Sequence, residues 1–156
     1  MDTVTRIALI DDDRDWVETL GEYLHRQGFS ILAAHDGAGG LALLERGGIP
    51  LALVDLNMPG MTGLELLRRV RQRHIPVTVL VVTSNDDPTL AARVRAEGGL
   101  AVLPKTAPPR VLLESVRQAF TRLRPPSRGS RLDKPWNRLL PGPRGIRLRT
   151  SDVSSN

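Results

Sequence analysis

The sequence contains no cysteine, which excludes a disulfide framework and any metal site built on thiolates. It also lacks a long hydrophobic run. The first apolar segment, residues 7–10, is far shorter than the core of a signal peptide or the ~20 residues of a membrane span. No internal repeat is found along the chain. From these absences we expect a cytoplasmic protein that does not enter a membrane.

The net positive charge of the chain lies in its last 32 residues. The formal net charge is +5, yet residues 1–124 carry 15 basic and 15 acidic side chains, so the excess falls in residues 125–156. That segment is rich in Pro, Gly, Ser and Arg and shows no sustained period, which is typical of a tail or linker. We predict one domain over residues 1–124 and a disordered basic tail over residues 125–156. The tail is too short for a three-helix DNA-binding domain.

Apolar runs alternate with amphipathic helical patterns through the first 124 residues. Runs made almost entirely of Val, Leu and Ile suit parallel strands that are buried on both faces, and alternation with helices implies right-handed crossovers. The pattern predicts a doubly wound α/β fold of five βα units around a parallel five-stranded sheet. The strands are expected at 4–10, 29–34, 51–54, 77–82 and 100–103, and the helices around 16–24, 41–44, 64–70, 90–94 and 112–123.

Carboxylates follow two of the predicted strands directly. Asp11 and Asp12 follow the first strand, and Asp55 follows the third. In a sheet of order 2-1-3-4-5 these two strands are neighbours, and ligands bind at their carboxyl ends because the strand order reverses there. Three carboxylates within ~4–5 Å would repel one another by several kcal/mol per pair. We therefore expect a hard cation that prefers oxygen ligands, Mg²⁺ in particular.

Two further polar residues stand at strand ends. A carboxylate beside a bound cation can act as a nucleophile toward a phosphoryl group. Thr83, after the fourth strand, can donate a hydroxyl hydrogen bond to such a group, and the ammonium of Lys105, after the fifth, can pair with it. We interpret Asp13 as the N-cap of the first helix and Trp16 and Tyr23 as core residues. The three histidines share no spacing and are assigned no site.

Four segments together resemble the signatures of response-regulator receiver domains. They are IDDD at 10–13, VDLNMPGMTGLELL at 54–67, VVTS at 81–84 and LPK at 103–105. The resemblance covers about residues 4–124 and implies a flavodoxin-like fold that is phosphorylated on Asp55.

The same resemblance implies a role for each strand-end residue. Asp12, Asp55 and the backbone carbonyl of Asn57 would bind Mg²⁺, and Asp11 would hold a water on the metal. Thr83 and Lys105 would contact the phosphoryl group. Residues 58–60 would form the turn after the phosphoacceptor, and the glycine at position 63 would begin the next helix.

Two positions depart from the receiver pattern. Many receivers carry an aromatic residue three positions before the lysine and a proline directly after it, whereas this chain has Val102 and Thr106 there. No aromatic side chain can then follow the movement of Thr83. The resemblance therefore implies that output depends on movement around Thr83 and the fourth helix, or on another surface.

These features predict a phosphorylation-controlled binding module of a two-component system, and not an enzyme. A sensor histidine kinase or a phosphotransfer protein would donate the phosphoryl group, and the modified domain would bind a downstream protein target. The sequence leaves that target open, and also whether the chain forms a homodimer.

Three alternatives are weighed against this reading. Phosphatases with an aspartyl nucleophile typically carry a second Asp two residues later as general acid, and Asn57 cannot supply that proton. The tail could bind nucleic acid through phosphates, or dock one helical turn through Trp136, Leu139 and Leu140. A flavin site on the same fold is disfavoured because the acidic pocket would repel the flavin phosphate.

Overall fold

The computed structural model describes residues 4–123, which form a five-stranded parallel sheet of order β2-β1-β3-β4-β5. The predicted fold class, including this strand order, is confirmed, and each strand lies within two residues of its predicted bounds. The predicted tail, residues 125–156, lies outside the described residues. The elements are β1 (Arg6–Ile10), α1 (Arg14–Arg26), β2 (Ser30–Ala34), α2 (Gly37–Glu45), β3 (Leu51–Val54), α3 (Gly63–Gln72), β4 (Thr78–Thr83), α4 (Leu90–Ala96), β5 (Ala101–Pro104) and α5 (Pro109–Leu123).

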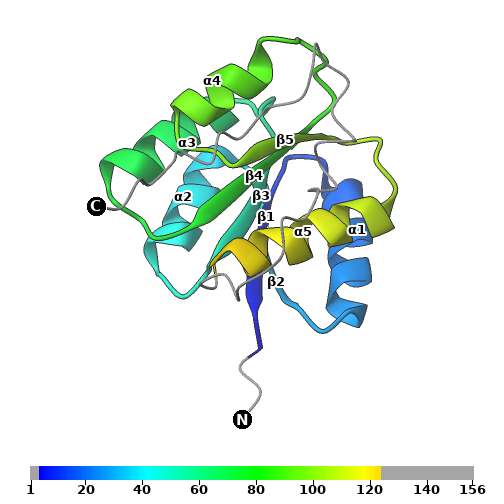
Figure 1. The fold of residues 1–156 in the computed structure, drawn as a ribbon. Helices are drawn as coiled ribbons and strands as arrows, with labels where there is room; N and C mark the ends of the chain where they lie inside the picture. The colour runs from blue at the N-terminus through cyan, green and yellow to red at the C-terminus, as the bar shows by residue number, and fades with distance from the viewer. Residues whose placement is uncertain (1–3, 124–156) are drawn as a thin grey trace, which may run out of the picture.

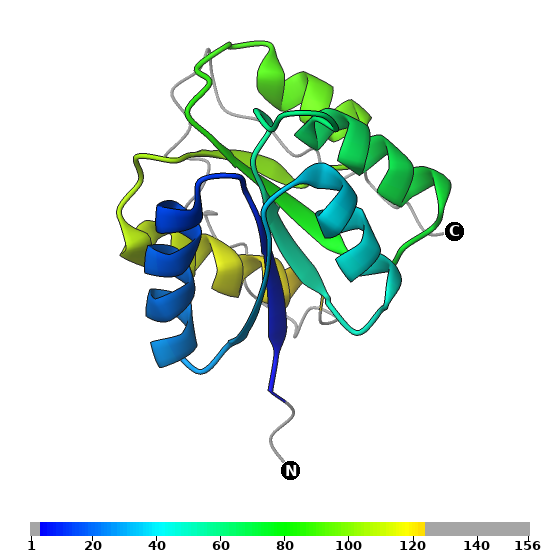
Figure 2. The same ribbon diagram turned by 180° about the vertical axis from the view of Figure 1, so that it is seen from behind.

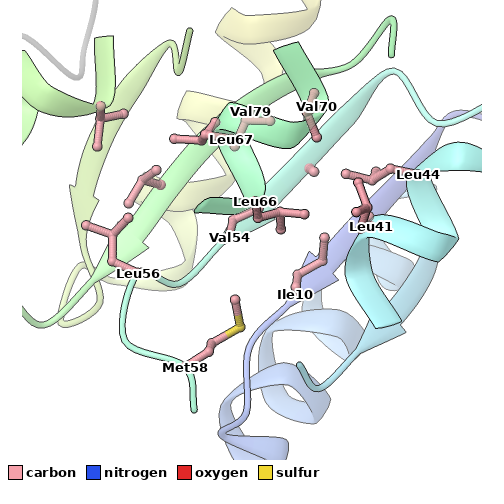
Figure 3. Close-up of a cluster of buried hydrophobic side chains, with 14 of the residues drawn as sticks. Ile10, Leu41, Leu44, Val54, Leu56, Met58, Leu66, Leu67, Val70 and Val79 are labelled. Atoms are coloured by element: carbon pink, nitrogen blue, oxygen red, sulfur yellow. The ribbon is translucent and has the colours of Figure 1, made fainter. Parts of the chain in front are cut away.

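Helices cover both faces of the sheet. Figures 1 and 2 show α1 and α5 on one face and α2, α3 and α4 on the other. Successive strand residues point to opposite faces, so Ile10 and Val54 pack toward α2 and α3 (Figure 3), whereas Leu9 and Leu53 pack toward α1 and α5. Because both faces are buried, the strands contain continuous apolar runs and not an alternating pattern.

The helices begin at the carboxyl edge of the sheet, and side-chain caps fix the starts of α1, α2 and α3. Asp13 caps α1 as predicted, since its Oδ1 accepts a hydrogen bond from the Trp16 N–H at 3.1 Å. Thr62 caps α3 through the Glu65 N–H at 3.2 Å. Gly63, the first residue of α3, packs so closely on β3 that a Cβ there would lie 2.8 Å from the Leu56 Cα. These contacts hold the segment after β3 in place.

A group of charged side chains lies at the C-terminal end of α4, where Glu97 is the C-cap. We call Arg68, Arg71 and Glu97 the Glu97 cluster. Nη2 of each arginine lies 3.2 Å from a carboxylate oxygen of Glu97, and Arg71 Nη1 donates to the Ala96 carbonyl at 2.7 Å. Hydrogen bonding from Arg68 and the positive charges of both arginines hold the pKa of Glu97 below its usual value. This cluster ties the last turn of α4 to α3.

The helices of the described domain are all too short or too polar for a membrane span. Within residues 4–123 no helix is long and apolar enough to cross a bilayer.

Candidate functional site

Three carboxylates meet at the carboxyl ends of β1 and β3. Ile10 pairs with Val54 in the sheet register, so the residues that follow them, Asp11 and Asp55, leave the sheet side by side. One ligand oxygen from each of Asp11, Asp12 and Asp55 lies within 4.8 Å of the others. Asp11 and Asp55 are buried and Asp12 is exposed. The structure thus brings together the three acids that the sequence placed at this edge, and we call them the acid cluster.

Lys105 supplies positive charge to the acid cluster. Its Nζ lies 2.8 Å from Asp11 Oδ2, 3.5 Å from Asp55 Oδ2 and 3.8 Å from Asp13 Oδ2. Its side chain is only 15% exposed, and its backbone N–H donates to the Thr83 carbonyl at 2.9 Å. One ammonium therefore faces several carboxylates across the end of the sheet.

Burial and charge shift two groups of this site. Burial raises the pKa of Asp11, and the negative charge of Asp55 raises it further, against the opposing effects of Lys105 and of a hydrogen bond from the Asp13 N–H. Burial lowers the pKa of Lys105, but its contact with Asp11 and the charges of the surrounding carboxylates outweigh this, so the pKa of Lys105 is raised overall. The site therefore favours the charged form of Lys105.

The donor set fits a hard divalent cation. Asp11 Oδ2 is buried and accepts no hydrogen bond of good geometry from residues 4–123, so its neighbour there is the Lys105 ammonium. The three possible ligand atoms of the acid cluster are all carboxylate oxygens, which are the ligands that Mg²⁺ prefers. The acid cluster is therefore a group of residues that could hold Mg²⁺.

Asn57 lies beside the acid cluster through its backbone. Its N–H donates to Asp55 Oδ1 at 3.3 Å, and its side chain is exposed. The backbone N–H at position 57 therefore lies at the Asp55 carboxylate.

Thr83 lies at the carboxyl end of β4 and is 1% exposed. Its Oγ1 accepts a hydrogen bond from the Asn85 N–H at 3.2 Å. Asn85 Oδ1 in turn accepts from the Asp87 N–H at 3.0 Å, and Asp87 Oδ1 from the Thr89 N–H at 2.9 Å. Three successive hydrogen bonds therefore join the Thr83 hydroxyl to the residue before α4.

The position of the missing aromatic is filled by a small buried side chain. Val102 is 8% exposed and belongs to the same apolar cluster as Leu90 and Val94 of α4. No ring lies there to follow a movement of Thr83, in agreement with the sequence.

Three residues near the site were not recognised as such from the sequence. Asp13 was interpreted as a cap alone, but it also lies 3.8 Å from Lys105 Nζ. Trp16 is half-buried and not fully in the core, and its ring centroid lies 5.1 Å from the same Nζ. His35 was assigned no site, yet its Nδ1 lies 3.2 Å from the Asp11 carbonyl oxygen. For Asp13 and Trp16 the sequence does contain a signal, because both lie at the start of the helix that directly follows Asp11 and Asp12.

The fold and the site define a class of protein, and the comparisons agree with it. The family described as "Response regulator receiver domain" matches residues 7–117, and the chain belongs to this family. It is 36% identical over 121 residues to the transcriptional regulatory protein CpxR of Klebsiella pneumoniae, covering 76% of this chain and 50% of CpxR. The chain thus spans about half the length of that relative.

Other relatives match over nearly their whole length. The chemotaxis protein CheY of Pseudomonas aeruginosa is 33% identical over 123 residues, which cover 76% of this chain and 98% of CheY. A CheY-like receiver domain from Methanospirillum hungatei superposes with a TM-score of 0.73 at 27% identity, covering 77% of this chain and 96% of that one. The receiver unit is therefore a complete protein in some relatives and part of a longer one in others.

Proposed function

We propose that this chain is a phosphoacceptor response regulator of a two-component system, phosphorylated on Asp55. The observation that carries the proposal is the placement of Asp55. Its carboxylate lies at a strand end beside two further carboxylates, with the Lys105 ammonium 3.5 Å away. A buried nucleophile with an ammonium nearby and two further carboxylates that could hold a cation suits phosphoryl transfer.

The reaction needs no turnover of a separate substrate. One Asp55 oxygen forms a bond to phosphorus while the bond from phosphorus to the donor nitrogen of a phosphohistidine breaks. The electron pair leaves with the imidazole, which takes up a proton. Lys105 would pair with a phosphoryl oxygen, and the Thr83 hydroxyl would donate to another. We therefore propose a phosphoacceptor domain that assists its own phosphorylation and dephosphorylation, and not an enzyme with an external substrate.

Mg²⁺ is the proposed cofactor. Asp12, Asp55 and the carbonyl of Asn57 would hold the ion, with Asp11 holding a water on it. When bound, the ion offsets the negative charge of the phosphoryl oxygens. The buried Asp11 Oδ2, which accepts no hydrogen bond of good geometry within the described residues, supports this assignment.

Receiver domains interact with histidine kinases or phosphotransfer proteins, and a protein of this kind in the cytoplasm is the proposed donor. The phosphorylated domain would favour a second conformation that binds a protein target or forms a homodimer. Moving the population from 1:99 to 99:1 requires ~5.5 kcal/mol. A doubly charged group held beside Lys105 and Mg²⁺ provides an interaction of that order.

The test is direct phosphorylation by a small donor. Incubation with acetyl phosphate and Mg²⁺ is expected to add the mass of one phosphoryl group to the intact protein, and the addition should be acid-stable and base-labile. Asp55→Asn should abolish it, whereas the matched change Asp87→Asn, at another acid near a strand end, should not. No mass gain in the wild type, or an undiminished gain in Asp55→Asn, would contradict the proposal.

A second candidate function rests on the charge of residues 125–156. These residues hold seven of the 22 basic side chains and two of the 17 acidic ones, which favours contact with phosphates. Deleting residues 125–156 should then abolish salt-sensitive binding of duplex DNA. If full-length protein binds no DNA at low salt, this second function is excluded.

A further inference from the structure

We propose that Trp16 is a positioning residue for Lys105: the face of its indole ring holds the ammonium at the acid cluster, where it can meet a phosphoryl group on Asp55. The inference rests on the proposed function and extends it to a residue of α1. Its basis is the 5.1 Å distance between Lys105 Nζ and the Trp16 ring centroid, which is within the range of cation–π attraction.

The ring is held rigidly enough to act as a support. Trp16 lies in the first turn of α1, and its backbone N–H donates to the carboxylate of the N-cap Asp13 at 3.1 Å. It is half-buried and packs against the apolar cluster that contains Val17 and Leu20 of the same helix. An indole side chain has only two rotatable bonds, so this packing leaves it little freedom.

Lys105 needs such a support because its own attachment is flexible. Four methylene groups separate its ammonium from the main chain, and Thr106, not proline, follows it directly. The carboxylates attract the ammonium from one side, most closely Asp11 at 2.8 Å. A ring face binds a cation without neutralising it, so Trp16 can steady the ammonium and leave its charge available to a phosphoryl oxygen.

The lysine signal tests the contact itself. The chain has two lysines, Lys105 and Lys134, so full-length protein labelled with ¹³C at lysine Cε gives two signals, and Lys134→Arg identifies which belongs to Lys105. We expect the Lys105 signal to be shifted upfield by the indole ring. The shift should be lost in Trp16→Leu and kept in Tyr23→Leu, a matched loss of a half-buried aromatic two turns along α1.

The phosphorylation rate tests the role. With acetyl phosphate and Mg²⁺, Trp16→Leu should slow phosphorylation by about threefold to tenfold, and Trp16→Phe, which keeps a weaker ring face, should restore most of the rate. In a Lys105→Gln background the same Trp16→Leu change should alter the rate by less than about twofold, because the partner of the ring is gone. Tyr23→Leu should leave the rate unchanged.

Each other outcome decides against the inference. An unshifted Lys105 signal in the wild type, a normal or faster rate in Trp16→Leu, equal slowing by Tyr23→Leu, or equal slowing in the Lys105→Gln background would overturn it. If Trp16→Leu fails to fold, Trp16→Phe and the wild-type signal still decide. If the wild type is not phosphorylated at all, the proposed function fails, and the lysine signal alone then decides whether Trp16 positions Lys105.

Discussion

The acid cluster lies at the carboxyl ends of β1 and β3 and the Glu97 cluster at the end of α4, and the pKa values of Asp11 in the first and of Glu97 in the second shift in opposite directions. Burial and a neighbouring carboxylate raise the pKa of Asp11, whereas hydrogen bonding and the charge of two arginines lower the pKa of Glu97. In the Glu97 cluster positive charge exceeds negative charge and the contacts are satisfied. In the acid cluster negative charge exceeds positive charge, and the one ammonium, that of Lys105, lies 2.8 Å from the buried Asp11 Oδ2.

This difference indicates that the Glu97 cluster has a structural role and that the acid cluster is the site for a ligand. An ion pair near the surface whose contacts are satisfied adds little to stability and needs no ligand to balance its charge. A buried excess of one charge costs stability and persists where a ligand supplies the missing charge. The predictions below test whether the two clusters differ in this way.

The largest expected effect is that of Lys105→Gln without metal. Removing the one ammonium leaves the acid cluster uncompensated, so the free energy of unfolding should fall by roughly 3 kcal/mol in EDTA. Mg²⁺ should restore a large part of the loss, and urea denaturation with and without the ion measures both. The comparison is Arg71→Gln in the Glu97 cluster, which should change little and show no response to Mg²⁺. An equal loss in EDTA and in Mg²⁺ would contradict this reading.

The next effect concerns the backbone beneath the acid cluster. Gly63→Ala places a Cβ against the Asp55 carbonyl and 2.8 Å from the Leu56 Cα, so stability should fall by about 1–3 kcal/mol. Phosphorylation should slow as well, because Asp55 must shift. Gly21→Ala is the control, since its Cβ would lie 3.4 Å from the Ile31 side chain and should stabilise α1 by about 0.5–1 kcal/mol. A stable, fully active Gly63→Ala would show that this edge is less tightly packed.

Asp11→Asn should have a smaller effect of the opposite sign. Because the pKa of Asp11 is raised on folding, the folded protein binds more protons than the unfolded one just above pH 3.8, and the contribution of this group to stability falls as pH rises through that range. Without metal, Asp11→Asn should gain about 1 kcal/mol at neutral pH. The difference between the two denaturation curves, measured against pH, isolates this group. A variant less stable than the wild type in EDTA would be the contrary result.

Glu97→Gln should have the smallest effect. The lowered pKa of Glu97 means that its contribution is present above its usual value of 4.5 and is lost as pH falls below it. The free energy of unfolding of the variant should therefore be slightly lower than that of the wild type at neutral pH, and equal to it at low pH or in high salt. Mg²⁺ affinity should be unchanged. A salt-independent loss, or a weakened response to Mg²⁺, would mean that the two clusters are coupled.

The sequence was sufficient for the sheet and for the residues at its edge. Apolar runs that alternate with helical patterns predict strands buried on both faces. Asp11, Asp55 and Lys105 directly follow β1, β3 and β5, and Thr83 is the last residue of β4. Their convergence follows from backbone geometry alone. Their chemical roles remain proposals.

Contacts that depend on side-chain conformation could not be predicted in this way. Trp16 and Lys105 are far apart in the chain, and their contact depends on the direction of one ring and one flexible stem. His35 reaches the Asp11 carbonyl across two neighbouring strands. Nothing in the spacing of Arg68 and Arg71 along α3 identifies Glu97 as their partner.

The series of hydrogen bonds from Thr83 to Thr89 has a consequence for α4. No side chain caps the start of this helix, so its entry depends on Asn85 and Asp87, whose turns begin at one buried hydroxyl. Thr83 is β-branched and has few rotamers available, which keeps that hydroxyl in one orientation. Rotation of that side chain would break the first of the three hydrogen bonds, from the Asn85 N–H, whereas Asp87 would still accept from Thr89 at the start of α4.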